Sequence, residues 1–237
     1  METRESKATL LARARVTAKE LAISATSPQA RADACLDLLD ELGADSRIEG
    51  LRRALHALPV EERHYWIGTL YTLMLPSKVR RSQATYFTPP AVADAVVDLA
   101  IEAGFNLSND DVLDPAAGGA AFLSTIAGRM ASAGLVAKDV AYRLNGIEID
   151  AGLATLSRRL IANRLGAPLP RDIIVVGDAL KVEMPRSSLA VPRRGAGWRG
   201  RQPASSTMAA ATFRRKPSTP KSCSPMGWRH MSGRQTY

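Results

Sequence analysis

Two features of the sequence could together form a binding site: a turn rich in small residues, and three acidic residues that follow apolar segments. Residues 114–123 read DPAAGGAAFL, and the small residues would let the backbone come close to a ligand. Free amides at the start of the next helix can donate hydrogen bonds to a carboxylate or a hydroxyl. Asp114, Glu148 and Asp178 would supply carboxylate acceptors, and their negative charges favour a ligand that carries positive charge.

These acids fall at the ends of three short apolar segments that we predict to be β-strands, at residues 111–114, 144–149 and 173–176. The last is a continuous apolar run, typical of a strand covered on both faces. The spacings between the acids are 34 and 30 residues, one βαβ unit each. This alternation predicts a parallel α/β sheet whose strands end at one common edge, where open sheets bind ligands. Apolar residues at helical spacing indicate the intervening helices: Phe122, Ile126 and Met130, then Leu153, Leu156, Leu160 and Leu165.

A further helix should begin shortly before the first of these strands. The sequence Thr88-Pro89-Pro90 is typical of a helix start, with Thr88 as the N-cap and proline in the first turn. Asp150 is interpreted as the N-cap of the helix after the second strand rather than as a ligand. The apolar face of the helix that begins near Pro90 would consist of Val92, Val96, Leu99 and Ala100.

Residues 1–80 are predicted to be helical. A helix should begin at Pro28, and a longer one should be ended by Pro76. We favour a helical cap that packs on the α/β part over an element that contacts nucleic acid; Arg80 and Arg81 fit either a solvated turn or a phosphate contact. Leucines at helical spacing support the helices: Leu36, Leu39 and Leu42, then Leu51, Leu55 and Leu58.

Residues 185–237 differ in composition from the rest of the chain. They contain 11 Lys or Arg and no Asp or Glu, which leaves 21 basic and 23 acidic residues in 1–184, a net charge of −2. The excess behind the formal net charge of +9 therefore lies in this tail. Three interpretations stay open: a disordered tail, a basic arm that binds nucleic acid, or an out-of-frame ending, which the loss of every acid favours.

Cysteine, histidine and hydropathy exclude several classes of protein. Cys35 and Cys223 lie far apart, and His56, His64 and His230 have no metal-ligand spacing. No apolar run approaches the roughly 20 residues that span a bilayer, and the polar start does not resemble an export signal. We therefore expect a cytoplasmic protein with no metal site and no membrane partner.

Four segments in order resemble motifs of the N6-adenine DNA methyltransferases of restriction–modification systems. Residues 114–123 are similar to that family's Asp-Pro-Ala-Cys-Gly-Ser-Gly-x-Phe-Leu motif, and residues 86–90 to the Tyr-Phe-Thr-Pro segment that precedes it. Residues 146–150 and 177–180 resemble the segments that end the second strand and follow the third. The resemblance covers about residues 83–180, and it implies a Rossmann-like domain that binds S-adenosyl-L-methionine.

The resemblance implies a role for seven residues in binding this cofactor. Glu148 would accept hydrogen bonds from both ribose hydroxyls, as an acid does in dinucleotide folds, and Asp178 would accept from the adenine amino group of the cofactor. The other five would surround its methionine end, Thr88 and Pro89 closing over it, Asp114 contacting the ammonium or its water shell, and Ala116 and Gly118 lining the turn.

Two departures from the family pattern bear on activity. Ala120 stands where the family has the last glycine of the turn, so its methyl group would crowd or shift the cofactor. The family's Asn-Pro-Pro-Tyr-type tetrapeptide, which receives the flipped adenine and orients its amino group for attack on the sulfonium methyl, does not follow Asp178. We therefore assign no catalytic residue.

The sequence thus predicts a helical region at 1–80, an incomplete Rossmann-like α/β methyltransferase domain at 81–184 and a basic tail at 185–237. The predicted function is that of a DNA adenine-N6 methyltransferase in a truncated or inactive form, with DNA and restriction–modification subunits as partners. The alternative is a non-catalytic component of a complex that holds the cofactor or binds DNA. A methyltransferase acting on RNA or on a protein amide is a further rival, which the Tyr-Phe-Thr-Pro and Asp-Pro-Ala pairing disfavours.

Overall fold

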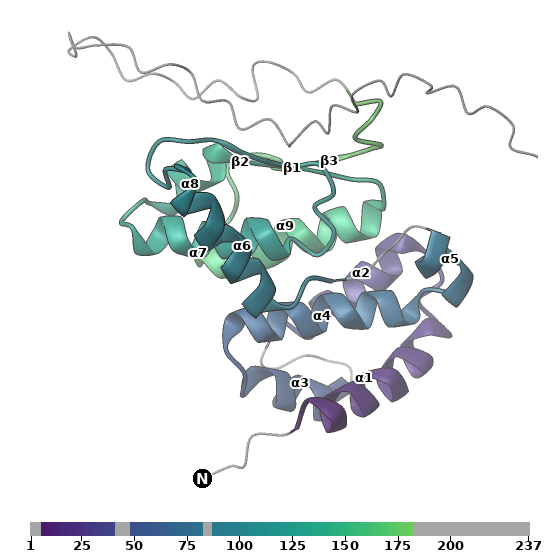
Figure 1. The fold of residues 1–237 in the computed structure, drawn as a ribbon. Helices are drawn as coiled ribbons and strands as arrows, with labels where there is room; N and C mark the ends of the chain where they lie inside the picture. Colours follow the sequence, from purple (N-terminus) through teal and green to yellow (C-terminus); the bar gives the residue numbers. More distant parts are fainter. Residues whose placement is uncertain (1–5, 41–47, 83–86, 183–237) are drawn as a thin grey trace, which may run out of the picture. The chain divides into compact units, whose positions relative to one another are not determined.

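The computed structural model describes residues 6–40, 48–82 and 87–182, a mixed α/β arrangement that is mostly helical (Figure 1). In these ranges a run of helices comes first, and a segment in which helices alternate with three short strands follows it. Predictions made for Leu42 and for the tail 185–237 lie outside the described residues.

Local signals in the sequence account for the starts of the first two helices. The hydroxyl of Ser6 accepts a hydrogen bond from the amide of Thr9 at 3.2 Å and caps α1. Ser27 caps α2 in the same way, accepting from the amide of Ala30 at 3.0 Å, and Pro28 occupies the first turn, so the predicted start there is confirmed. The helices of this part are α1 Lys7–Ala22, α2 Pro28–Leu36, α3 Glu49–His56, α4 Val60–Met74 and α5 Ser77–Ser82.

The helix that begins at Pro28 is shorter than the leucine spacing predicts. It ends at Leu36, and Leu39 lies in the turn that follows. Arg52 on α3 explains this end, because its guanidinium donates to the carbonyl of Asp37 at 3.2 Å and forms an ion pair with the carboxylate of that residue at 2.7 Å. A side chain thereby satisfies a carbonyl that a longer helix would have bonded internally.

Three parallel strands form one sheet with β2 in the centre, so the prediction of three parallel strands is confirmed. In register, Asp114 of β1 lies beside Gly146 of β2, and Glu148 of β2 lies beside Val176 of β3. The elements of this part are α6 Pro90–Glu102, β1 Val112–Asp114, α7 Ala121–Ser132, α8 Ala137–Arg143, β2 Leu144–Glu148, α9 Ala151–Leu165 and β3 Ile174–Val176.

The helices α7 and α9 pack on the same face of this sheet (Figure 1). The strands are neighbours in chain order, and two right-handed crossovers then place both connecting helices on one side. In the part of the chain that the structure describes, no helix covers the opposite face, and Leu113 is 47% exposed. The prediction that 173–176 is covered on both faces is wrong for Val176, the last residue of β3, which is also 47% exposed.

The predicted apolar face of α6 is wrong. Val92, Val96 and Leu99 are 50%, 43% and 64% exposed, whereas Ala93 and Val97 are buried in the core with α7. The sequence of α6 is apolar on nearly every side, so its periodicity does not select one face. In the observed orientation, Arg129 of α7 also contacts two carboxylates of α6, those of Asp94 and Asp98, at 3.1 and 3.0 Å.

Thr88 is not the N-cap of α6. The cap is Pro89, and the helix begins at Pro90 without a side-chain hydrogen bond at the cap. Thr88 precedes the N-cap position by one residue, so its hydroxyl does not cap the helix. By contrast, the prediction for Asp150 is confirmed, since its carboxylate caps α9 by accepting from the amides of Gly152 and Leu153 at 2.8 and 3.0 Å.

The helical part packs on the α/β part, as the interpretation of a helical cap predicts. Helices α2 and α4 contact α9, and α4 also contacts α6 and α7. Polar contacts across this boundary include His64 Nε2 to Asn163 Oδ1 at 2.9 Å, the Tyr71 hydroxyl to Asp150 Oδ1 at 2.6 Å, and Arg164 to Glu61 at 2.6 Å.

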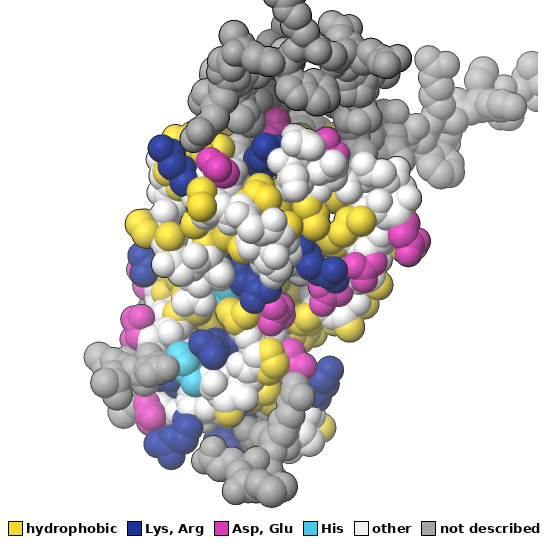
Figure 2. Space-filling view, turned by 90° about the vertical axis from the view of Figure 1, so that its left-hand side faces the viewer, with side chains coloured by type: hydrophobic (Ala, Val, Ile, Leu, Met, Phe, Trp, Pro, Cys, Tyr) yellow, Lys and Arg dark blue, Asp and Glu magenta, His cyan; other side chains and the backbone are white. Residues whose placement is uncertain are grey.

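The surface mixes charges and apolar groups. On the face seen in Figure 2, acidic and basic side chains lie beside one another, with apolar side chains between them. Within the described ranges, no helix combines the length and the apolar character that crossing a membrane would require.

Candidate functional site

The turn after β1 is held by hydrogen bonds of its own backbone and of β2. Asp114 Oδ1 accepts from the amide of Ala116 at 3.0 Å, and the amide of Ala117 donates to the carbonyl of Ile147 at 2.9 Å. Ser157 of α9 donates its hydroxyl to the carbonyl of Gly118 from behind. The turn is thus fixed against the central strand before α7 begins at Ala121.

Glu148 joins the turn to the end of β2. One carboxylate oxygen accepts from the amide of Gly118 and the other from the amide of Asp150, both at 2.8 Å. The residue is only 8% exposed, and this burial raises the pKa of its carboxyl while the two amides act against the rise. Each oxygen keeps a second lone pair, so the carboxylate can still accept from a hydroxyl at the rim.

The three predicted acids have different surroundings. Burial raises the pKa of Asp114, at the end of β1. Asp178 follows β3, and its pKa is lowered by the hydrogen bond from the amide of Leu180 and by the ammonium of Lys181 at 3.2 Å. The amide of Gly177 donates to the carbonyl of Glu148 at 2.9 Å, so the segment that carries Asp178 lies beside the end of β2.

Phe87 has a place that the sequence did not indicate. A Cβ atom on Gly119 would overlap the ring of Phe87, and so would one on Gly68 of α4. The space left by Gly119 therefore accommodates this ring rather than a ligand. The ring of Phe87 packs against both the turn and α4, and so connects the turn to the helical part. The neighbouring Tyr86 lies outside the described residues.

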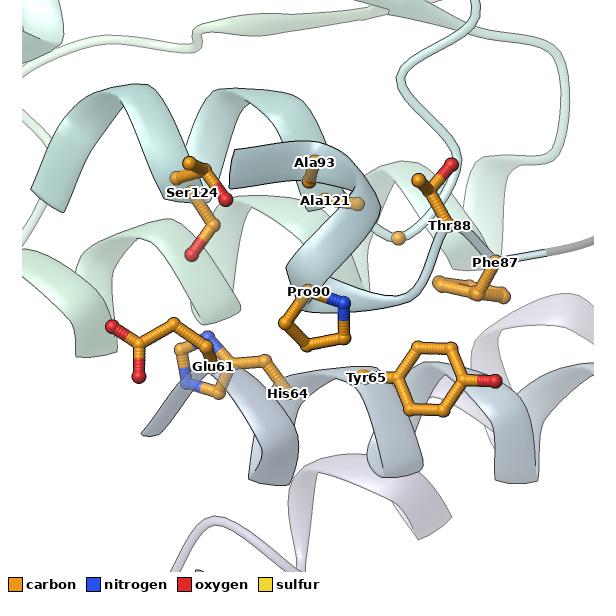
Figure 3. Close-up of a pocket in the computed structure, with 11 residues that line it drawn as sticks. Glu61, His64, Tyr65, Phe87, Thr88, Pro90, Ala93, Ala121 and Ser124 are labelled. Carbon is orange, nitrogen blue, oxygen red and sulfur yellow. The ribbon is translucent and has the colours of Figure 1, made fainter. Parts of the chain in front are cut away.

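Thr88 lies in a small pocket between α4, α6 and α7 (Figure 3). The pocket has a volume of about 20 Å³, enough for a water molecule but far below the several hundred Å³ of a nucleoside site. Of the seven predicted cofactor ligands, Thr88 alone lines it. The lining residues are Glu61, His64, Tyr65, Phe87, Thr88, Pro90, Ala93, Gly119, Ala121, Ser124 and Thr125.

His64 is the buried titratable group of this pocket. Its Nε2 donates to Asn163 Oδ1, which leaves Nδ1 as a buried acceptor without a hydrogen-bond partner. Burial is the main cause that lowers the pKa of His64 from 6.5 to about 4, so the ring is neutral at physiological pH. The sequence offered no signal that His64 would be buried, since Glu61, Glu62 and Arg63 directly precede it.

The methyl group of Ala120 does not crowd the rim of the turn, contrary to the expectation from the sequence. Ala120 is fully buried in the core around α7. Its φ of 60° is left-handed, like the φ of 51° at Gly118, and a left-handed backbone at alanine costs about 1–2 kcal/mol. The turn therefore keeps a glycine-like conformation with alanine in it.

The structure brings some of the predicted ligands together and leaves others apart. Gly118 and Glu148 are in direct contact, and Asp114 and Asp178 flank them at the same edge of the sheet. Ala116 and Pro89 are exposed. Chemically, this edge offers amide donors and carboxylate acceptors, which suit the binding of a polar ligand.

Comparison with protein families, with curated proteins and with solved structures finds no match for this chain.

Proposed function

We propose that this chain is the cofactor-binding part of a DNA adenine-N6 methyltransferase with a Rossmann-like domain, and that S-adenosyl-L-methionine binds at the carboxyl edge of its sheet. The observation that carries the proposal is the hydrogen bond from the Gly118 amide to the Glu148 carboxylate. It joins a glycine turn after the first strand to an acid at the end of the second. A nucleoside that bridges these two features would meet amide donors and a ribose acceptor together.

The charges at the edge suit a sulfonium ligand. Asp114, Glu148 and Asp178 lie at this edge of the sheet, and of the three only Asp178 has a cationic partner among the described residues, Lys181. A positively charged ligand would relieve the unfavourable burial that raises the pKa of Asp114 and of Glu148. Binding of S-adenosyl-L-methionine should therefore be tighter than binding of S-adenosylhomocysteine, which has the same nucleoside without the sulfonium charge.

Calorimetric titration with S-adenosyl-L-methionine tests this proposal. Glu148→Gln should weaken binding about tenfold or more, because an amide cannot accept two ribose hydroxyl bonds as a carboxylate does. Glu102→Gln is the matched control, since this exposed acid at the end of α6 lies outside the edge. A folded wild-type chain that binds no S-adenosyl-L-methionine, or a Glu148→Gln variant that binds as tightly as wild type, would contradict the proposal.

A second candidate, a non-catalytic component of a complex, is supported by a fact of the sequence. No Asn-Pro-Pro-Tyr-type tetrapeptide occurs in the 237 residues. Without it, nothing is assigned to hold the adenine amino group in line with the sulfonium methyl. We expect the chain alone to bind the cofactor and to transfer no labelled methyl group to DNA; transfer by the purified chain would exclude this candidate.

A further inference from the structure

A groove with a volume of about 580 Å³ lies over the helical part, on the side of α4 that meets α1 and α5. It is separate from the carboxyl edge of the sheet, because none of Asp114, Gly118, Glu148 or Asp178 lines it. Its lining combines arginines, hydroxyl side chains and two aromatic rings: Arg15, Tyr65, Thr69, Thr72, Leu73, Ser77, Arg80, Arg81 and Phe87.

The groove is positively charged. Arg15, Arg80 and Arg81 line it, and no acidic residue of the described ranges does. Arg80 donates to the carbonyl of Thr72 at 3.4 Å and Arg81 to the carbonyl of Ser77 at 3.3 Å, so most of their N–H groups have no acceptor among the residues that the structure describes. None of the three forms an ion pair within the described ranges, in contrast to Arg52, Arg53, Arg129, Arg158 and Arg164, which all contact carboxylates.

The spacing of the charges favours an extended anion over a single one. Arg15 comes from α1, whereas Arg80 and Arg81 are consecutive in α5, so the cations line the groove from two different helices. A chain with regularly spaced charges can contact cations on both helices at once. The groove has room for part of such a chain.

The aromatic lining favours nucleic acid over an acidic peptide. Tyr65 is partly exposed in the groove, and its hydroxyl makes no hydrogen bond in the described part of the chain. Its ring is supported edge-on by Trp66, with the ring centres 5.5 Å apart. A ring held in this way is a stacking surface for a base, a group that an acidic peptide does not have.

We infer that this groove binds the sugar–phosphate backbone of a nucleic-acid strand, with the three arginines on phosphates and Tyr65 against a base. The inference goes beyond the proposed methyltransferase function and does not depend on it, because charge and stacking alone would hold the strand. A failure of cofactor binding would leave it intact.

Fluorescence anisotropy with a labelled single-stranded DNA of about 20 nucleotides tests the inference on the full chain, from about 50 to 200 mM salt. The variant Arg15→Gln/Arg80→Gln/Arg81→Gln should bind about tenfold or more weakly at the lower salt. Its logarithmic salt slope should fall by about 2, since each lost phosphate contact removes about 0.7 on single strands. The basic tail is the same in every protein compared and contributes equally to each.

Arg159→Gln is the matched control for an exposed arginine without an ion pair in the described residues, and it should change affinity less than about twofold. Replacing the three groove arginines with lysine should retain most of the salt slope, because the charge is kept. Tyr65→Leu should weaken binding about fivefold or more through lost stacking. Circular dichroism verifies that each variant is folded.

Two results would overturn the inference. One is a folded triple glutamine variant that binds the labelled strand with wild-type affinity and salt slope, since the groove would then have no part in binding. The other is polyglutamate that displaces the strand from the wild-type chain as effectively as unlabelled DNA does, since the groove would then select charge alone and not nucleic acid.

Discussion

At the scale of single residues, His64 shows how surroundings decide what a side chain does. Its spacing in the sequence indicates neither a metal site nor a nucleophile partner, and the structure places it in a pocket wall, where its one hydrogen bond among the described residues is to Asn163. A protonated ring would leave a second N–H without an acceptor in a buried place. Protonation of His64 is therefore coupled to folding.

This coupling predicts a pH dependence of stability. The folded pKa of His64, about 4, lies below the unfolded value of 6.5, so its contribution is complete above pH 6.5 and is lost as the pH falls through 4. The loss should approach about 3 kcal/mol. Urea unfolding at several pH values between these limits should show a smaller change for His64→Gln than for wild type. Equal changes in the two proteins would contradict the prediction. The acids with raised pKa values are present in both proteins, so their effect on stability cancels in the comparison.

Gly119 gives a second test at this scale. Gly119→Ala should destabilise the fold by about 1–3 kcal/mol, because the new methyl group must displace the ring of Phe87. Gly134→Ala is the control: its φ of 92° is left-handed but the space around it is open, so about 1 kcal/mol of backbone strain is expected. Thermal unfolding should show that the double variant Gly119→Ala/Phe87→Ala loses less stability than the sum of the two single variants. Additive losses would mean that the space at Gly119 is not needed for the ring of Phe87.

At the scale of elements, the three strands could be predicted and the orientation of α6 could not. Each strand is a short apolar run between helices, and the order of elements alone implies parallel pairing. The glycine turn and Glu148 could also be predicted as neighbours, since both follow strands that end at one edge. In α6, however, apolar residues occupy most sides of the helix, so their spacing does not select one face, and the face with Ala93 and Val97 is buried in a core with α7, which is distant in the sequence.

A matched pair of substitutions tests this orientation. Val97 is buried against α7, so Val97→Ala should cost about 2 kcal/mol in free energy of unfolding. Val96 is 43% exposed, so the same change there should cost less than about 1 kcal/mol. Denaturant unfolding measures both free energies. A larger loss of stability for Val96→Ala than for Val97→Ala would contradict the orientation in the structure and support the one that the sequence pattern predicts.

At the scale of the whole chain, the contacts between the helical part and the α/β part were not predictable in detail. Amphipathic spacing indicates that helices pack, but it does not specify which helices do so. The two parts approach each other closely at Gly152, where a side chain would overlap both the carbonyl of Pro28 and the hydroxyl of Tyr71. The partners in these contacts are far apart in the sequence: 79 residues separate Tyr71 from Asp150, and 99 separate His64 from Asn163. No local pattern in the sequence therefore indicates these pairs.

These contacts predict that the two parts unfold together. Burial raises the pKa of the Tyr71 phenol, so its hydroxyl stays protonated and donates to Asp150, the cap of α9. Tyr71→Phe should cost about 1–2 kcal/mol and should lower hydrogen-exchange protection in α4 and α9 by similar factors. Tyr142→Phe on α8 is the control, because that hydroxyl makes no hydrogen bond in the described residues. If Tyr71→Phe lowered protection in α4 alone, the helical part would be a separate folding unit, and its groove could bind a strand without any effect on the edge that carries Glu148.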